Sequence, residues 1–367
     1  MVLMNQRIGI VVRGGVSPAN WSGTPAGLAG GLEACGYDVV VCSADMMMNA
    51  YRLVRLCLRA ARQPEDGWLV APAIMKTREL SARWRQRRLP PVSGWIVLGS
   101  ENGVPVKGPF VTLDDLTVAE CRHHPWYFPP FSQGTWDHWQ ANQRRLFSEA
   151  RRCFAATEWA AASIIRDYSI ASERVEVVGL GRNIDVSAPI SRDWSRPRFL
   201  FVGSEWDRKN GPAVVEAFSD LRRQFPSAEL SIVGEHPPVE VAGVHDYGRL
   251  RLDRADDREV LKELLATSTC LVVPSQFEPF GIVYAEAQAA GLAIIGTSRG
   301  GAPEVVGPAG LCVDPEDHGA IKNAMLQMAD AEVAKRYGSA GPSHVERYSW
   351  ERIARQMAAA LPGVITA

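Results

Sequence analysis

The chain has 367 residues, too many for one ordinary domain and suited to two domains of about 150–200 residues. Its net charge of −1 gives no indication of a nucleic-acid partner. No apolar run approaches the ~18 residues of a membrane span, the start lacks a signal-peptide cleavage site, and the seven cysteines show no CxxC pair. We therefore expect a cytoplasmic protein with reduced thiols and without zinc or disulfides.

The first half alternates short apolar strands with helices, which predicts a doubly wound parallel sheet. Strands are expected at Arg7–Arg13, Tyr37–Cys42, Trp68–Ala71, Trp95–Leu98, Pro109–Leu113 and Arg152–Ala156. Helices are expected at Pro25–Ala34, Asp45–Arg62, Thr77–Arg88 and Glu158–Tyr168. The segment 123–139 reads as an aromatic loop that belongs either to the core or to an acceptor cleft. Its aromatic residues are Trp126, Tyr127, Phe128, Phe131, Trp136 and Trp139.

The sequence lacks the glycine motif that would indicate a nicotinamide-dependent oxidoreductase. Gly14-Gly15 follows the first strand, and Gly179-Leu-Gly181 occurs later, but neither has the third glycine of a dinucleotide fingerprint. The helix at Thr77–Arg88 is unusually basic and contains Trp84. We interpret it as the charged solvent face of a crossover helix, with contact to an anionic membrane or a lipid-diphosphate acceptor as the alternative.

The polar stretch Ile184–Pro197 predicts a linker, after which the alternation of strands and helices resumes. Strands are expected at Arg198–Val202, Leu230–Gly234, Val241–Tyr247, Cys270–Val273, Leu292–Gly296 and Gly310–Val313. Helices are expected from an N-cap at Asn210 through Arg223, and at Arg258–Ala266, Phe280–Ala290, Asp317–Asp330 and Trp350–Leu361. Lys209 directly precedes the first of these helices, where a cation opposes the helix macrodipole. A bound anion would explain this placement, and a solvated loop lysine is the alternative.

The stretch 271–306 is the most informative part of the chain. A strand-to-helix turn directs the backbone N–H groups of Phe280, Gly281 and Ile282 toward one point, which suits a phosphate. Glu286 lies four residues after Ile282 on the same helix face, ~6–9 Å from the helix start. That is about the distance from a diphosphate to a ribose, whose diol a carboxylate binds well. The alternative is that Glu278 is a favourable acid near a helix start and Glu286 a solvated position.

These residues resemble the Glu-x7-Glu signature of the retaining family 4 glycosyltransferases, here Glu278 to Glu286 followed by GGAPEVV. The segment 21–25, WSGTP, resembles their N-terminal loop, where Gly23 and Thr24 would contact donor or acceptor; ordinary helix capping is the alternative. Two positions depart from the family. Asp114 in VTLDDL replaces a histidine, so either it takes part in the reaction or it caps the strand end. The segment 203–211 resembles the family's GR-x4-KG diphosphate site, in which Lys209 matches the lysine. Ser204 stands where the family has an arginine, and Arg208 is the candidate to supply the missing positive charge.

The resemblance implies the GT-B fold, two Rossmann-like doubly wound domains facing across a cleft. The expected boundaries are residues 1–185 for an acceptor-side domain, 186–348 for a nucleotide-sugar-binding domain, and 349–367 for a helix that crosses back. The implied enzyme is a metal-independent, retaining, hexosyltransferase-type glycosyltransferase without a cofactor. It would move a sugar from a nucleotide-diphosphate donor to a hydroxyl-bearing acceptor by front-face attack. The implied catalytic residues are Glu278, Asp114 and Lys209, and the implied donor-binding residues are Lys209, Arg208, Phe280, Gly281, Ile282, Val283 and Glu286.

Two other functions stay open from the sequence. A sugar-nucleotide epimerase can share this two-domain fold, and a protein that only binds nucleotide sugars would need no catalytic residues. The acidic pair and Lys209 argue against the second of these. The motifs do not select among UDP, GDP, ADP and dTDP donors, or among glycan, lipid-linked and small-molecule acceptors, and they give no oligomeric state; membrane contact is expected to be peripheral at most.

Overall fold

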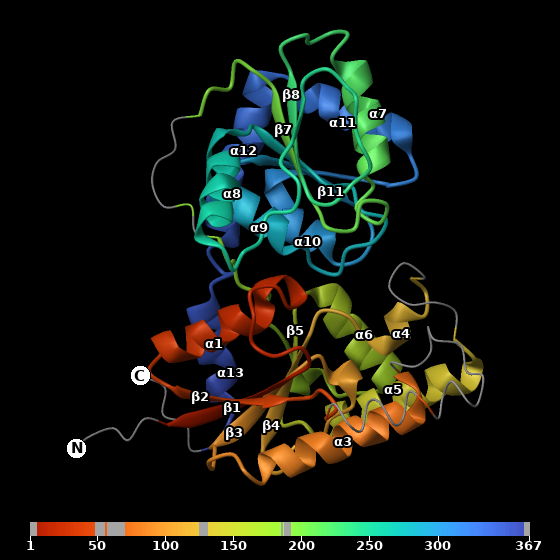
Figure 1. Cartoon of the computed structure of the whole chain (residues 1–367), viewed down its shortest axis with the longest axis vertical. Helices are drawn as coiled ribbons and strands as arrows, with labels where there is room; N and C mark the ends of the chain where they lie inside the picture. Colours follow the sequence, from red (N-terminus) through yellow and green to blue (C-terminus); the bar gives the residue numbers. More distant parts are fainter. Residues whose placement is uncertain are drawn as a thin grey trace. The chain divides into compact units, whose positions relative to one another are not determined.

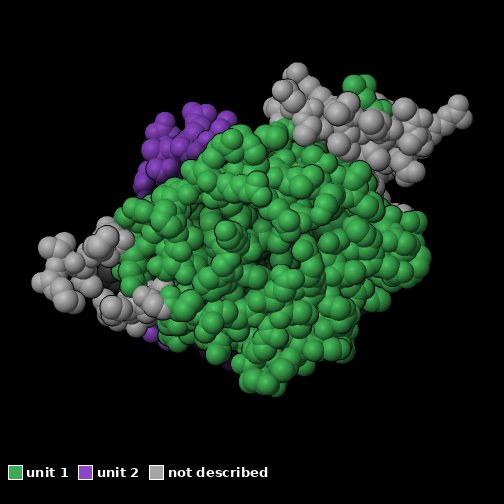
Figure 2. All heavy atoms as spheres, turned by 90° about the horizontal axis from the view of Figure 1, so that it is seen from below, with its two compact units in different colours: residues 1–181, 349–367 green, residues 182–348 purple. Residues whose placement is uncertain are grey.

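The computed structural model describes residues 6–47, 56, 70–124, 131–184, 186 and 192–362. The chain forms two compact units, which Figure 2 colours separately. Unit 1 contains residues 1–181 and 349–367, and unit 2 contains residues 182–348. Each unit is built on one six-stranded parallel sheet with helices against it (Figure 1), as expected for a Rossmann-like domain.

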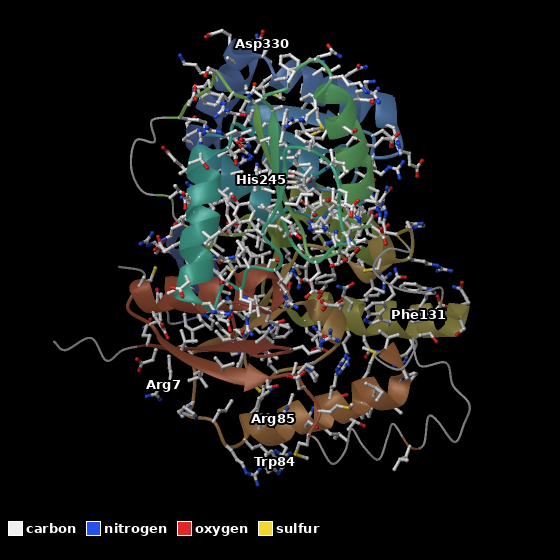
Figure 3. All side chains as sticks on the ribbon, turned by 45° about the horizontal axis from the view of Figure 1, so that its top comes forward. Arg7, Trp84, Arg85, Phe131, His245 and Asp330 are labelled. Atoms are coloured by element: carbon white, nitrogen blue, oxygen red, sulfur yellow. The ribbon has the colours of Figure 1, made fainter. Side chains whose placement is uncertain are left out.

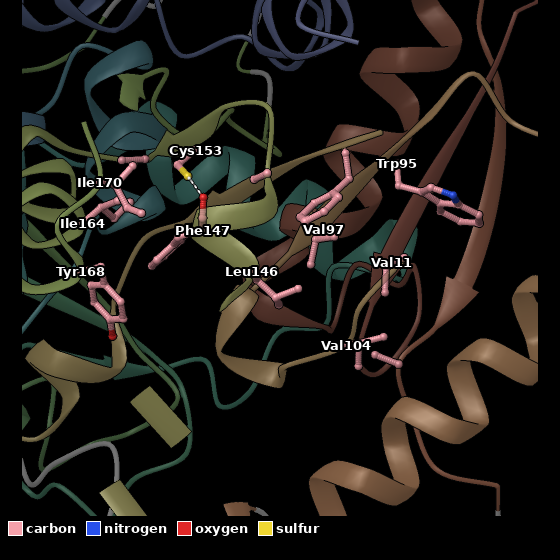
Figure 4. Close-up of a cluster of buried hydrophobic side chains, with 14 of the residues drawn as sticks. Val11, Trp95, Val97, Val104, Leu146, Phe147, Cys153, Ile164, Tyr168 and Ile170 are labelled. Atoms are coloured by element: carbon pink, nitrogen blue, oxygen red, sulfur yellow. Dashed lines mark hydrogen bonds between the residues drawn. The ribbon is translucent and has the colours of Figure 1, made fainter. Parts of the chain in front are cut away.

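Unit 1 has the strand order β2-β1-β3-β4-β5-β6, so the order reverses between β1 and β3. Its strands are β1 (Arg7–Val12), β2 (Asp38–Ser43), β3 (Gly94–Leu98), β4 (Phe110–Asp114), β5 (Cys153–Ala155) and β6 (Val175–Val177). Its α-helices are α1 (Thr24–Ala34), α3 (Pro72–Gln86), α4 (Val118–Cys121), α5 (Gln133–Glu149), α6 (Glu158–Tyr168) and α13 (Trp350–Ala359). Short 3-10 turns are η1 (Trp21–Gly23), η3 (Ser100–Asn102) and η4 (Ser172–Arg174). Figure 4 shows part of the core, where Leu146 and Phe147 of α5 pack with Val97 and Tyr168.

The last helix, α13, packs against α1 of unit 1 (Figure 1). Three glycines make room for its first residue, Trp350. A Cβ atom added at Gly27 or Gly181 would lie 2.0 or 2.3 Å from the indole, and one at Gly31 would lie 2.5 Å from the Trp350 carbonyl oxygen. Because real Cβ contacts are never this short, these glycines are a condition for the docking of α13.

Unit 2 has the strand order β12-β11-β10-β7-β8-β9, again with all neighbouring strands parallel. Its strands are β7 (Arg198–Val202), β8 (Glu229–Val233), β9 (Val244–Asp246), β10 (Cys270–Val272), β11 (Ala293–Thr297) and β12 (Gly310–Val313). Its helices are α7 (Gly211–Leu221), α8 (Ala255–Thr267), α9 (Ile282–Ala289), α10 (Ala302–Val306), η5 (Gly307–Ala309), α11 (His318–Met328) and α12 (Ala331–Val345). Because β7 and β10 are neighbours, the loops after these two strands emerge side by side.

Two expectations for the first half are wrong where the structure describes them. No strand forms at Val70–Ala71, because Val70 lies in a 3-10 turn and α3 begins at Pro72, a residue suited to the first helical turn. The end of the expected aromatic loop belongs to α5, whose N-cap Ser132 accepts from the Thr135 N–H. Most of the expected helix Asp45–Arg62 lies outside the described residues, as do Trp68 and the aromatic residues Trp126, Tyr127 and Phe128.

Two further corrections concern unit 2. Asn210 precedes α7 but does not cap it through its side chain: it has a left-handed backbone (φ 62°), and its Nδ2 donates to the Pro315 carbonyl over 2.8 Å. Helix α12 was not expected, because Gly338, Gly341 and Pro342 lower its helical propensity. Its glycines permit close packing, since a Cβ at Gly338 would lie 2.3 Å from the Gly291 carbonyl oxygen. None of the described helices is both long and apolar enough to cross a membrane.

Candidate active site in unit 2

The loop after β7 places Lys209 beside the loop after β10. The chain turns tightly through 203–211, with the Lys209 N–H donating to the Glu205 carbonyl over 2.8 Å and the Gly211 N–H donating to the Trp206 carbonyl over 3.0 Å. The Lys209 side chain then reaches Glu278, and its Nζ donates a hydrogen bond to Glu278 Oε2. The two side chains are only 12% and 9% exposed, so they form a buried ion pair between loops 69 positions apart in the sequence.

Burial and neighbouring charges shift the pKa values of Lys209 and Glu278 in opposing ways. Burial alone would raise the pKa of Glu278, but the positive charges of Lys209 and Arg208 hold the pKa of this carboxyl below its usual range. Burial also lowers the pKa of Lys209, against the opposing influence of Glu278. Ser275 adds a 3.4 Å hydrogen bond from its hydroxyl to Glu278 Oε2. The site is therefore a carboxylate–ammonium pair in a mostly dry environment.

Arg208 connects the same two loops in another way. Its guanidinium forms a two-point pair with Glu205, and Nη1 donates to the Phe277 carbonyl over 3.0 Å. Nη1 also lies 3.7 Å from Glu278 Oε2, and the Arg208 carbonyl accepts from the Gln276 N–H over 2.7 Å. Arg208 is 8% exposed, so most of its hydrogen-bonding capacity holds the loop 276–278 in place.

The start of α9 lies directly beside this pair. Gly281 has φ +80° and precedes the first residue of the helix, and a Cβ there would lie 3.1 Å from Glu278 Cγ and 2.4 Å from the Tyr284 ring. No described residue accepts a hydrogen bond from the backbone N–H groups of Phe280, Gly281, Ile282 or Val283. These N–H groups and the positive end of the helix dipole make this turn suitable for an anion.

Glu286 lies on α9 four residues after Ile282, the first residue of that helix, and is buried at 6% exposure. Its Oε1 accepts hydrogen bonds of 3.1 Å from both the Asn183 and the Ile184 backbone N–H. Burial raises the pKa of Glu286 to about 7, although these two hydrogen bonds favour the ionised form. It is therefore not a solvated helix position, and it binds the backbone just after the chain enters unit 2.

The expected residues of unit 1 lie at the carboxyl ends of β1 and β4. Gly23 is the N-cap position of α1 with φ 84°, and no side chain caps this helix. The Thr24 hydroxyl is fully buried and has no hydrogen-bond partner among the described residues. The preceding Trp21 and Ser22 both have left-handed backbones, at φ 43° and 51°, a strained conformation for residues other than glycine. The Trp21 indole N–H donates to Asp115 Oδ2 over 3.1 Å.

Asp114 is the last residue of β4 and is buried at 1% exposure. Its Oδ1 accepts from the Ser100 backbone N–H over 2.7 Å and from the Ser100 hydroxyl over 2.6 Å, while Gln143 Nε2 donates to that hydroxyl over 2.9 Å. Burial raises the pKa of Asp114 to about 7, and burial followed by the Asp114 charge raises that of Glu101 to about 8. This geometry fits a strand-end cap. Asp114 Oδ2 has no partner among the described residues.

The structure thus joins Lys209, Arg208 and Glu278 in one cluster and leaves Glu286 a turn and a half away on α9. Sequence reasoning missed Glu205 and Ser275, which support this cluster. Glu205 lies three residues before Arg208, a spacing at which opposite charges often pair on a helical turn, and this was the available signal. Within the described part of the chain, no three His, Cys, Asp or Glu side chains are grouped so as to hold a metal ion.

Parts of the chain are similar in sequence to known proteins. Residues 196–331 match the family model of the glycosyl transferases group 1. The chain is 27% identical over 263 residues to MMP alpha-(1->4)-mannosyltransferase of Mycolicibacterium hassiacum, a match that covers 68% of this chain and 62% of the relative. It is 32% identical over 197 residues to alpha-maltose-1-phosphate synthase of Mycolicibacterium smegmatis, covering 48% and 50%. The chain thus spans between half and two thirds of the length of these relatives.

Solved structures resemble the chain over nearly its whole length. Sucrose-phosphate synthase from Thermosynechococcus elongatus matches with a TM-score of 0.70 at 18% identity, covering 97% of this chain and 98% of that one. Anabaena Alr3699/HepE in complex with UDP matches with a TM-score of 0.64 at 16% identity, covering 97% and 99%. Both units therefore have the Rossmann-like architecture of GT-B proteins, and residues 196–331 resemble the glycosyl transferases group 1.

Proposed function

We propose that this protein is a retaining glycosyltransferase that moves a sugar from a nucleotide-diphosphate donor to a hydroxyl-bearing acceptor. The observation that carries the proposal is the buried Lys209–Glu278 pair directly beside the α9 N-terminus. The group 1 family match and the glycosyltransferase names of relatives such as the mannosyltransferase support the reaction class. Support for a nucleotide donor comes from HepE, a structural neighbour solved with UDP.

In this proposal the donor diphosphate binds the N–H groups at the start of α9, and Lys209 turns toward it. The negative charge that develops on the leaving diphosphate is then offset by an ammonium and a helix dipole already in place. Glu286 lies at the right distance along α9 to bind the ribose hydroxyls. Once Lys209 binds the diphosphate, Glu278 becomes available to the donor sugar, where a carboxylate stabilises positive charge at the anomeric carbon. Because the ammonium and the N–H groups supply the positive charge, we expect no metal requirement.

Purified protein should therefore be screened with UDP-, GDP-, ADP- and dTDP-sugars, first by thermal shift and then for transfer to an acceptor panel. We expect one donor to stabilise the protein and to be turned over in the presence of EDTA, with the anomeric configuration retained in the product by NMR. Lys209→Ala and Glu278→Gln should each lower kcat/KM at least about tenfold. The matched control is Lys262→Ala, which changes a lysine on α8.

Other results would assign the site differently. Interconversion of the free nucleotide sugar without transfer would identify an epimerase. Donor binding without turnover on any acceptor would favour a binding protein, and an inverted product would exclude the retaining mechanism. If both site variants keep wild-type turnover, the cluster is not the active site.

A further inference from the structure

The outward face of α3 combines exposed apolar and basic side chains. Leu80 and Trp84, one helical turn apart, are 56% and 44% exposed and are among the few large apolar residues exposed in the described chain. Figure 3 shows Trp84 directed away from the body of unit 1. The opposite face of the same helix is buried through Ile74, Met75 and Ala82. The buried face of α3 thus packs on the core, while about half of the Leu80 and Trp84 surface stays open to solvent.

Basic side chains surround these two residues. Lys76, Arg83, Arg87 and Arg88 are all exposed, and the Arg88 guanidinium lies 3.6 Å from the Trp84 ring centroid. Residues 72–92 contain six Lys or Arg and one acid, in a chain whose net charge is −1. The one acid, Glu79, is 11% exposed and pairs with Lys76 and Arg83. We call Lys76, Leu80, Arg83, Trp84, Arg87 and Arg88 the α3 outer face.

We propose that the α3 outer face docks the protein on an anionic lipid bilayer, with α3 lying in the plane of the headgroups. Arginine and lysine side chains bind lipid phosphates, while a tryptophan and a leucine between them insert at the boundary of headgroups and acyl chains. The charge complementarity selects an anionic surface, and the exposed indole selects a lipid interface over a purely aqueous polyanion. This inference is independent of the proposed catalytic activity.

The test is flotation of the full chain with vesicles of phosphatidylcholine alone or mixed with phosphatidylglycerol. We expect binding to the mixed vesicles only, weakened by added NaCl because salt screens the exposed charges. The triple variant Arg83→Glu, Arg87→Glu, Arg88→Glu should lower the partition coefficient at least about tenfold. The matched control, Arg223→Glu, Arg249→Glu, Lys262→Glu, reverses three charges in unit 2 and should leave binding unchanged. Circular dichroism and the Tm of each variant should be measured to check that it is folded.

Insertion of Leu80 and Trp84 into the bilayer can be measured separately from electrostatic binding. Brominated phosphatidylglycerol should quench wild-type fluorescence more than that of Trp84→Phe, and Leu80→Ser with Trp84→Ser should weaken binding without changing its salt dependence. The proposal is overturned if the protein does not float with anionic vesicles, or if the unit 2 control loses binding as strongly as the triple variant. Equal quenching in wild type and Trp84→Phe, or displacement of the protein from vesicles by stoichiometric duplex DNA, would overturn it in favour of an unspecific polyanion site.

Discussion

The Lys209 ammonium and the Glu278 carboxylate form a hydrogen-bonded ion pair that is almost completely buried between the loops after β7 and β10. Each of these charges would be strongly unfavourable in this buried site without the other, since burying an isolated charge costs much free energy. The pair thus keeps an ammonium beside the α9 N-terminus before any ligand arrives. A diphosphate can then exchange one anionic partner of Lys209 for another.

Breaking this pair from one side should destabilise the protein more than removing both charges. We expect Lys209→Met or Glu278→Gln alone to lower the free energy of unfolding by about 3–5 kcal/mol, because Glu278 is then left with only the more distant Arg208, and Lys209 with no buried carboxylate. The double variant should lose less than the sum of the two. Urea unfolding followed by circular dichroism measures the cycle, and additive losses would show that the two side chains do not interact.

The pH dependence of donor binding should reflect the ionisation of the Glu286 carboxyl group. Its pKa is about 7 in the folded protein against an ordinary 4.5, so the folded state binds a proton that the unfolded state releases between these values. Stability attributable to Glu286 is therefore fully present below pH 4.5 and is lost as pH rises toward 7, by up to about 3 kcal/mol. Donor affinity should change in the opposite direction, because the ionised carboxylate binds a ribose diol more strongly. Calorimetric titration of the donor between pH 5.5 and 8.5 should show this rise in wild type, whereas a similar rise in Glu286→Gln would contradict the assignment.

Glu205 should affect catalysis through Arg208. Glu205→Gln removes the charge that orients the Arg208 guanidinium, which also holds the Phe277 carbonyl next to Glu278. Because Glu205 is 54% exposed, the effect on stability should stay below about 1 kcal/mol. We expect kcat to fall by about three- to tenfold with little change in the KM for the donor, measured by initial rates. Glu235→Gln, at an exposed acid in unit 2, is the control; an increase in KM alone would mean that Arg208 binds the donor directly.

Two adjacent glycines of α1 should respond oppositely to alanine. A Cβ at Gly31 would meet the Trp350 carbonyl oxygen at 2.5 Å, whereas one at Gly30 would meet nothing within 4 Å. Gly31→Ala should lower the Tm of the protein by displacing α13. Gly30→Ala should raise stability by about 0.5–1 kcal/mol, because alanine favours the helix. Equal effects in differential scanning calorimetry would show that α13 does not pack on α1 as described.

Much of the fold was predictable because its signal is local. The strands Arg198–Val202 and Gly310–Val313 and the helix Glu158–Tyr168 coincide with the predicted segments, since short apolar runs and capped amphipathic helices carry their own periodicity. Helices α5 and α12 were missed for a physical reason. Trp136 and Trp139 form a buried face of α5 in a stretch whose sequence is rich in aromatic residues and proline. Gly338 lies where a Cβ would be 2.3 Å from the Gly291 carbonyl oxygen, so its place in a helix depends on a contact distant in sequence.

The sequence alone proposed candidate residues for the site, but it did not give their partners. It identified Lys209, Glu278, Gly281 and Glu286 from charge placement, turn geometry and spacing along one helix. Only the tertiary structure decided that Lys209 pairs with Glu278, that Glu286 binds the backbone of 183–184, and that Asp114 faces Ser100. These contacts join segments 14 to 103 positions apart. Such contacts depend on which strands become neighbours in the sheet, and local sequence carries no information on that.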